Sequence, residues 1–285
     1  MILGGKVTPS MRVETVSSPD GVELKYAHCG LSGRPCIALI MPFGLRVELA
    51  EAFFNFYKSR YDVVTWESRL ILDSSAREVR PEDFAMLNHV YDLVSVLRAC
   101  RVSRVALVGY CSGAGIGLAA ANRFPQLFSS LTLVHGEYTL LSDESCTTQF
   151  SADIDSLLSI AAQSNEAARQ VFEKVSSDRS MATMNLPAGI DTPFTKLPYL
   201  RRHALTYLAY KSTDFKRLAR SVSHRSLLLT GNRDAQTNVE STRKIHGLMR
   251  NADIHVDPDA DHYGILREDS KTLATIWNYL GEQLH

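Results

Sequence analysis

Short, mostly apolar runs alternate along this chain with longer stretches that repeat their apolar residues at helical spacing. The runs have the length of strands and lie at 36–41, 61–66, 104–109, 130–135 and 226–230. Continuous apolar runs are typical of strands buried on both faces, as in a parallel sheet. Between them, stretches such as 81–97 show the spacing of amphipathic helices. This alternation predicts an α/β fold with a mostly parallel sheet and helices on both of its faces.

Two regions depart from this alternation. Near the amino terminus, a Pro19-Asp20-Gly21 turn joins two short strand-like segments and indicates a β-hairpin. From about 141 to 215 the pattern is one of helices and loops, without a buried-strand run. We therefore expect a core of residues 1–140 and 216–285, with residues 141–215 inserted as a helical cap above the strand ends.

Composition narrows the classes of function. The 285 residues include 31 Lys plus Arg and 31 Asp plus Glu, so no net charge attracts the chain to nucleic acid or to an anionic membrane. No run approaches the roughly 18 apolar residues of a membrane span, and the first residues lack the apolar core of a signal peptide. Five cysteines without Cys-x-x-Cys spacing fit a reducing cytoplasm, which is the expected location. The sequence leaves the oligomeric state open.

The turn after the strand at 104–109 carries a specific chemical signal. It consists of Gly109-Tyr110-Cys111-Ser112-Gly113 and has the strand–turn–helix setting of a nucleophile elbow, with cysteine at its centre. The flanking glycines fit this setting, because the central residue is strained and only small neighbours let strand and helix approach closely. The positive end of the following helix dipole favours a thiolate there. We therefore expect Cys111 to be the nucleophile.

Ser112 is the alternative nucleophile, because serine is the more familiar residue in such turns. Placing Ser112 at the centre of the elbow would require glycines at positions 110 and 114, which are Tyr110 and Ala114. The glycines at 109 and 113 centre the turn on Cys111 instead. Ser112 is then expected to contribute its backbone N–H.

Candidate partners for Cys111 follow later strands. Asp234 comes just after the strand at 226–230 and would hold an imidazole in the correct tautomer and stabilise its charged form. His262 follows the last predicted strand and would act as the general base. Nucleophile, acid and histidine thus occur in the chain order that accompanies a nucleophile elbow. The predicted triad is Cys111, His262 and Asp234.

Other carboxylates compete for the role of Asp234. Asp259 and Asp261 flank the histidine, and either is a possible acid partner. Glu137, just after the strand at 130–135, is a further candidate. Taken singly, each of these residues has an ordinary loop or surface role as its simplest explanation. The prediction depends on three matches in order, each after a predicted strand.

An oxyanion hole requires two backbone N–H groups that point at the developing negative charge. One is expected from Ser112. The other is expected from the loop after the strand at 36–41, which has the sequence Met41-Pro42-Phe43-Gly44. Because proline has no N–H, the donor position falls on Phe43.

These residues resemble those of the α/β-hydrolase superfamily, and the resemblance covers almost the whole chain. The segment Pro19–Tyr26 is similar to the first hairpin of that superfamily. Trp66-Glu67-Ser68-Arg69 stands where many members have an aspartate, an arginine and a glycine. The Gly109-Tyr110-Cys111 elbow is similar to that of dienelactone hydrolases, which are cysteine members of the superfamily.

The resemblance implies an eight-stranded, mostly parallel sheet and a substrate pocket shaped by the cap. We expect Tyr110, Glu137 and Tyr207 to line this pocket, although packing within the cap is the simpler role for Tyr207. No Gly-x-Gly-x-x-Gly pattern follows a strand and no metal ligands cluster in the sequence, so no cofactor and no metal are expected.

Cysteine at the elbow predicts acyl chemistry. A thiolate–imidazolium pair attacks esters and thioesters, and the acyl-enzyme is itself a thioester that reacts with water, thiols or amines. We therefore expect hydrolysis or acyl transfer on a small ester or thioester. One alternative is a non-hydrolytic lyase that eliminates a group such as acetate from an acylated natural-product intermediate, as some α/β-hydrolase-like enzymes do. A second alternative is a ligand-binding protein without catalysis.

Overall fold

The computed structural model describes residues 11–31, 33–73, 75, 77–177 and 186–282. The expectation about a signal peptide concerns residues 1–10, which lie outside this range. Within the range, no helix combines the length and the apolar character that crossing a membrane requires.

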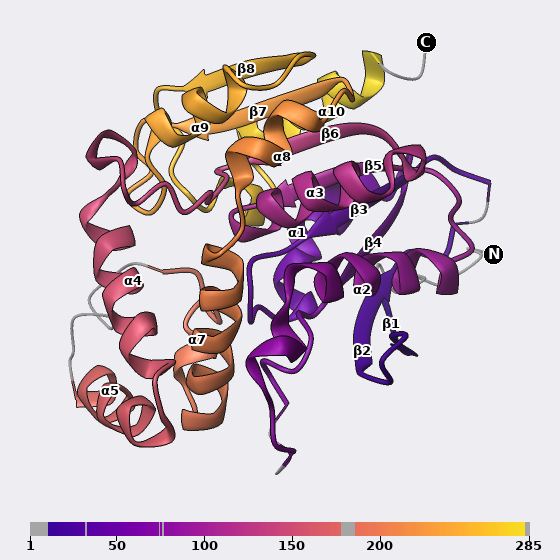
Figure 1. Cartoon of the computed structure of the whole chain (residues 1–285). Helices are drawn as coiled ribbons and strands as arrows, with labels where there is room; N and C mark the ends of the chain where they lie inside the picture. The colour runs from indigo at the N-terminus through magenta and orange to yellow at the C-terminus, as the bar shows by residue number, and fades with distance from the viewer. Residues whose placement is uncertain (1–10, 32, 74, 76, 178–185, 283–285) are drawn as a thin grey trace, which may run out of the picture.

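The strands of the described chain form one eight-stranded sheet in the order β1-β2-β4-β3-β5-β6-β7-β8 (Figure 1). They are β1 Arg12–Ser17, β2 Glu23–His28, β3 Cys36–Ile40, β4 Asp62–Trp66, β5 Val105–Tyr110, β6 Phe128–Val134, β7 Ser226–Gly231 and β8 Ala252–Asp257. β1 and β2 form the predicted hairpin, and β2 also pairs antiparallel with β4. The other pairs are parallel. The predicted, mostly parallel sheet is confirmed.

The central strands are buried on both faces, as their continuous apolar runs predict. Along β3, Ile37 and Leu39 join one hydrophobic cluster, while Ala38 and Ile40 join the other. Successive side chains of a strand point to opposite faces, so one short apolar run supplies two cores. Burying each isoleucine or leucine side chain of the strand stabilises the fold by about 1.5–3 kcal/mol.

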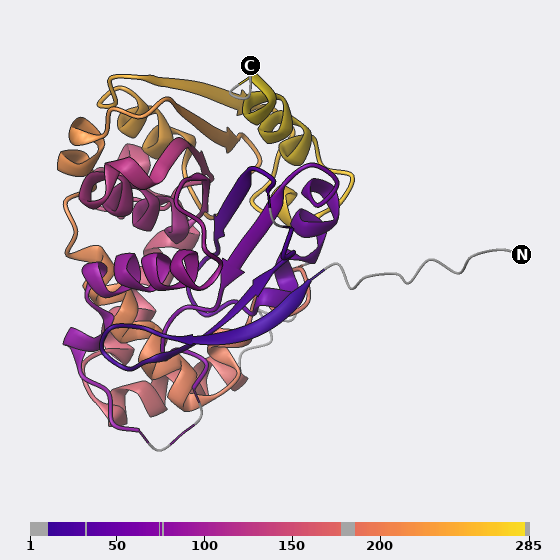
Figure 2. The same ribbon diagram turned by 90° about the vertical axis from the view of Figure 1, so that its right-hand side faces the viewer.

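Helices cover both faces of the sheet (Figure 2). Apolar residues of α1 (Glu51–Tyr57) and α10 (Lys271–Glu282) belong to one cluster. The opposite cluster receives residues of α2 (Met86–Ala99), α3 (Ser112–Arg123), α8 (Phe215–Ser221) and α9 (Val239–His246). The helix that was expected from position 81 begins later, at Met86. Residues Pro81–Phe84 form a separate 3-10 turn, and Ala85 is extended with ψ 143°.

Between β6 and β7 the described chain forms α4 (Gln149–Ala161), α5 (Asn165–Ser177) and α7 (Leu197–Lys211), which we call the insertion helices. They lie together at one end of the sheet (Figure 1). Arg202 of α7 is buried and holds them against the loop after β4. Its guanidinium donates to the carbonyl oxygens of Leu70, Asp73, Ser75 and Arg77.

Candidate active site

Cys111 occupies the strained turn between β5 and α3. Its backbone has φ 54° and ψ −120°, a region that residues with a side chain rarely adopt. The flanking glycines are required by space: a Cβ on Gly109 would lie 2.6 Å from the Gly113 carbonyl oxygen, and one on Gly113 would lie 2.1 Å from that of Ile40. Ser112 is the first residue of α3 and is not in the strained position. The elbow is therefore centred on Cys111, as the glycine spacing predicts.

Asp234 and His262 are brought to the same place by the loops after β7 and β8. Asp234 Oδ2 lies 2.8 Å from Nδ1 of His262, and both side chains are buried. The side chain of Cys111 interacts with the same imidazole and raises its pKa. The structure thus places the three predicted residues in one row, although they are far apart in sequence.

The carboxylate of Asp234 is fixed by its own loop. Its Oδ1 accepts hydrogen bonds from the backbone N–H groups of Gln236 (2.8 Å) and Thr237 (2.9 Å), and its Oδ2 accepts one from the Thr237 hydroxyl (2.6 Å). His135, at the end of β6, is a neighbour that the sequence reasoning missed. Its Nδ1 lies 2.8 Å from the same Oδ2, without the angles of a hydrogen bond. A histidine directly after a buried strand is the signal that could have indicated it.

Electrostatics favour a charged pair at this point. Burial alone would raise the pKa of Asp234, but the charge of His262, its hydrogen bond to the carboxylate and the nearby His135 hold that pKa well below its ordinary value. Burial would lower the pKa of His262, but the charges of Asp234 and Cys111 outweigh it and raise the pKa to about 10. The imidazole is therefore an imidazolium at neutral pH, and it can stabilise an adjacent thiolate.

The competing carboxylates face other partners. Asp259 Oδ1 lies 2.9 Å from a guanidinium nitrogen of Arg233, and Asp261 pairs with Arg267. Glu137 lines the cavity beside the elbow, and its Oε1 accepts a hydrogen bond from the Thr139 N–H at 2.6 Å. Of these acids, Asp234 is the one hydrogen-bonded to His262 among the described residues.

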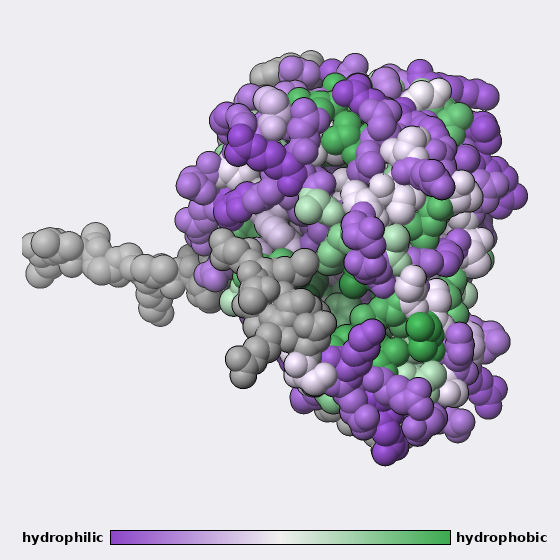
Figure 3. All heavy atoms as spheres, turned by 90° about the vertical axis from the view of Figure 1, so that its left-hand side faces the viewer, coloured by the Kyte–Doolittle hydropathy of each residue, from purple (hydrophilic) through white to green (hydrophobic). Residues whose placement is uncertain are grey.

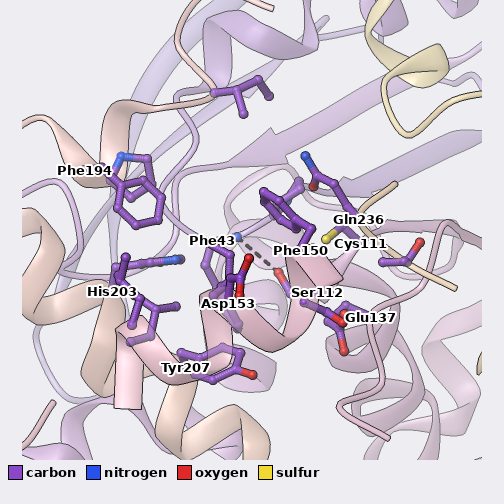
Figure 4. Close-up of a pocket in the computed structure, with 18 of the residues that line it drawn as sticks. Phe43, Cys111, Ser112, Glu137, Phe150, Asp153, Phe194, His203, Tyr207 and Gln236 are labelled. Carbon is purple, nitrogen blue, oxygen red and sulfur yellow. Dashed lines mark hydrogen bonds between the residues drawn. The ribbon is translucent and has the colours of Figure 1, made fainter. Parts of the chain in front are cut away.

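The two predicted oxyanion donors lie side by side, with an interaction that was not anticipated. The N–H of Phe43 donates to the hydroxyl oxygen of Ser112 at 3.2 Å (Figure 4). The N–H of Ser112 begins α3, so it has no partner within the helix. A substrate oxygen that uses both N–H groups must therefore displace the Ser112 hydroxyl from Phe43.

A cavity of about 640 Å³ opens above Cys111 and is enclosed largely by the insertion helices. Apolar residues gather around a hollow on the face that carries α4 and α5 (Figure 3). Tyr110, Glu137 and Tyr207 all line the cavity, as expected. Tyr207 also donates a hydrogen bond from its hydroxyl to Asp155 of α4 at 2.9 Å, so its position is fixed by packing between the insertion helices.

His135, Asp234 and His262 offer three atoms of the kind that bind metal ions, within 4.8 Å of one another. Both histidine nitrogens lie only 2.8 Å from the carboxylate oxygen. Ligands bound to zinc at about 2.0–2.2 Å in a tetrahedron lie farther apart, at roughly 3.3 Å. The cluster has the spacing of a charge-assisted hydrogen-bonded group and does not fit a shared metal ion.

A strained residue after β5, an acid after β7 and a histidine after β8 define the α/β-hydrolase class of enzymes. The family described as "alpha/beta hydrolase fold" matches residues 47–269, and the chain belongs to it. It is an enzyme of this type.

A curated relative is the L-allo-isoleucyltransferase of Pseudomonas savastanoi pv. glycinea, 27% identical over 258 residues, which are 87% of this chain and 88% of that protein. Among solved structures, the enol-lactonase from Burkholderia xenovorans LB400 has a TM-score of 0.74 at 15% identity, covering 94% of this chain and 100% of that one. The thermophilic esterase from Thermogutta terrifontis has a TM-score of 0.71 at 16% identity, covering 95% and 99%. These structural likenesses concern the fold.

Proposed function

We propose that this enzyme is a cysteine-nucleophile member of its family that transfers an acyl group through a thioester on Cys111. The observation that carries the proposal is the row of Cys111, His262 and Asp234, with the cysteine at the strained elbow and the imidazole held as a cation. A structural cysteine would not need a strained backbone, a buried imidazolium and a buried carboxylate, each of which is costly to maintain.

In the first step, the thiolate of Cys111 attacks the carbonyl carbon of an ester or thioester, and a new carbon–sulfur bond forms. The N–H groups of Ser112 and Phe43 hold the oxyanion. The tetrahedral intermediate collapses, the bond to the leaving oxygen or sulfur breaks, and the leaving group takes the proton of His262. In the second step, His262 removes a proton from the acceptor, which attacks the acyl carbon and releases the Cys111 thiolate.

Transfer is favoured over hydrolysis by two observations. A relative that matches 87% of this chain is named L-allo-isoleucyltransferase. A thioester on Cys111 is also an activated donor toward thiols and amines, and the cavity above it is lined mainly by apolar residues, which suit an organic acceptor. We further propose that residues 141–215 act as a cap that shapes this cavity around the acyl group.

The test is the intact mass of the protein after brief exposure to a panel of ester and thioester donors, with and without a thiol acceptor. Wild type should gain the mass of the acyl group on Cys111 and lose it faster when the acceptor is added. Cys111→Ala should keep its fold and form no adduct. Decay that is unaffected by the acceptor would indicate hydrolysis. Undiminished turnover in Cys111→Ala would contradict the proposal and direct attention to elimination, whereas a function independent of Cys111 would indicate a binding protein.

A further inference from the structure

The carboxylate of Glu137 lies on the wall of the cavity next to the elbow (Figure 4). The backbone of Glu137 is hydrogen-bonded to that of Cys111, because the N–H of Glu137 donates to the carbonyl oxygen of Cys111 at 3.2 Å. The hydroxyl of Tyr210, from α7, donates to the carbonyl oxygen of Glu137. The backbone of Glu137 is thus hydrogen-bonded both to Cys111 and to an insertion helix.

The segment around Glu137 is strained. His135 has φ 48° and Thr139 has φ 47°, so two residues with side chains adopt the left-handed region within five positions of each other. Such strain persists only where the surrounding structure enforces it, and it is concentrated at functional sites. Here it turns the chain so that Glu137 faces the cavity, and the N–H of Thr139 donates to its Oε1 at 2.6 Å.

No lysine or arginine of the described chain pairs with this carboxylate. Burial in the cavity wall raises the pKa of Glu137 to about 7, while the Thr139 N–H and the charge of His262 lower it. An acid that only stabilised the fold would be expected to have a cationic partner, since an unpaired carboxylate in an apolar setting is destabilising. The missing partner is therefore expected on the ligand.

We propose that the acyl group carried by Cys111 is an α-aminoacyl group with an apolar side chain, and that the Glu137 carboxylate binds its ammonium group. This inference rests on the proposed acyl transfer. In an α-aminoacyl group the ammonium nitrogen lies about 2.5 Å from the reacting carbonyl carbon, from the standard N–Cα and Cα–C bonds. The carboxylate that recognises it must then lie beside the nucleophile, which is where Glu137 stands.

The rest of the cavity suits an apolar amino-acid side chain. Its wall on the insertion helices carries apolar residues, among them Phe150, Ile154, Leu157, Val171 and Val175. Asp153 is the other acid on the cavity wall, but it belongs to α4 rather than to the elbow region. Glu137 would thus bind the ammonium group of the substrate, and the apolar wall on the insertion helices would contact its side chain.

The test compares two N-acetylcysteamine thioesters that differ only in the amino group, L-isoleucyl and 3-methylpentanoyl. The second-order rate constant for acylation of Cys111 is measured by quenched flow and intact mass. Because an ammonium group also activates the neighbouring carbonyl, the informative quantity is the change in the ratio of the two rate constants between wild type and Glu137→Gln. Glutamine keeps the size of the side chain and an acceptor for the Thr139 N–H.

Glu137→Gln should lower the ratio by roughly 10- to 100-fold, the range for loss of a charge-assisted hydrogen bond, with the 3-methylpentanoyl rate changed by less than about three-fold. Asp153→Asn should keep the wild-type ratio. An equal loss with both thioesters would assign Glu137 a structural role and overturn the inference, as would an unchanged ratio. If wild type were acylated by neither thioester, the proposed acyl transfer itself would be refuted.

Discussion

Replacing Asp234 with asparagine should leave His262 neutral at neutral pH. Asp234 Oδ2 lies 2.8 Å from Nδ1 of His262, and at an effective dielectric of about 20 this separation gives roughly 6 kcal/mol of attraction. After the opposing effect of burial, Asp234 and, to a smaller extent, Cys111 raise the pKa of His262 to about 10 from an ordinary 6.5. This rise corresponds to a net stabilisation of about 5 kcal/mol for the imidazolium. Asparagine keeps the shape and removes the charge, so we expect the pKa of His262 to fall below about 7.

The assay is an NMR titration of nitrogen-15-labelled histidine between pH 5 and pH 10, alongside the rate of Cys111 acylation. Wild-type His262 should remain protonated through the neutral range, whereas in Asp234→Asn it should lose its proton there. Acylation should slow by about 10²- to 10⁴-fold, since asparagine favours the wrong tautomer. Asp259→Asn, which removes a neighbouring exposed carboxylate, should change neither result. A variant His262 still protonated at pH 8 would refute the reasoning.

The same ion pair predicts a pH-dependent stability in a Cys111→Ala background, where the raised pKa of His262 depends on Asp234 without the contribution of Cys111. The folded-state pKa of His262 is raised, so its contribution is fully present below about 6.5 and is lost as the pH rises toward the folded-state value. The folded-state pKa of Asp234 is lowered, so its contribution is present above about 3.8 and is lost as the pH falls. Denaturant unfolding should show a loss of about 1.4 kcal/mol per pH unit above pH 6.5, relative to a variant that also carries Asp234→Asn. If the free energy of unfolding changed equally with pH in the two variants, a charged pair between Asp234 and His262 would be contradicted.

Three further changes test the packing around the site. Ser112→Ala removes the acceptor of the Phe43 N–H and should accelerate acylation by up to about 10-fold; a ten-fold loss would mean that the hydroxyl itself donates to the oxyanion. Gly113→Ala places a Cβ 2.1 Å from a backbone oxygen and should destabilise the protein by about 3 kcal/mol or more in urea unfolding. Gly281→Ala is the matched control in α10, because its Cβ would meet nothing within 4 Å. It should stabilise the protein by about 0.5–1 kcal/mol. Arg202→Ala leaves several loop carbonyls without their donor and should cost roughly 3–5 kcal/mol, and a cost below about 1 kcal/mol would show that the insertion helices are held in other ways.

The local sequence pattern was sufficient to predict the sheet and the elbow. A run such as Cys36–Ile40 is apolar at every position, which is compatible with burial on both faces and with little else. The elbow could also be predicted, because the Gly-x-x-x-Gly spacing around Cys111 is a local pattern. The structure supplies the reason for each glycine: a Cβ at position 109 would meet the backbone of Gly113, a near neighbour in the chain, whereas a Cβ at position 113 would meet the backbone of Ile40 on a distant strand.

The choice among acids required the tertiary structure. Asp234, Asp259, Asp261 and Glu137 all follow strands at the same end of the sheet, and no local rule ranks them. The path of each loop decides which of these acids reaches His262. In the structure Asp234 is hydrogen-bonded to His262, whereas Asp259 and Asp261 form ion pairs with arginines.

By itself the sequence determined the order of strands and helices along the chain, the strained position of Cys111 and the set of acids and histidines that could act as its partners. These features follow from periodicity and from the spacing of residues around each turn. Only the tertiary structure decided that His135 touches the Asp234 carboxylate, that Ser112 covers the Phe43 N–H, and that Glu137 faces the cavity without a cationic partner. Contacts between distant segments depend on the three-dimensional path of every loop between them, and that path is set by the packing of the whole molecule.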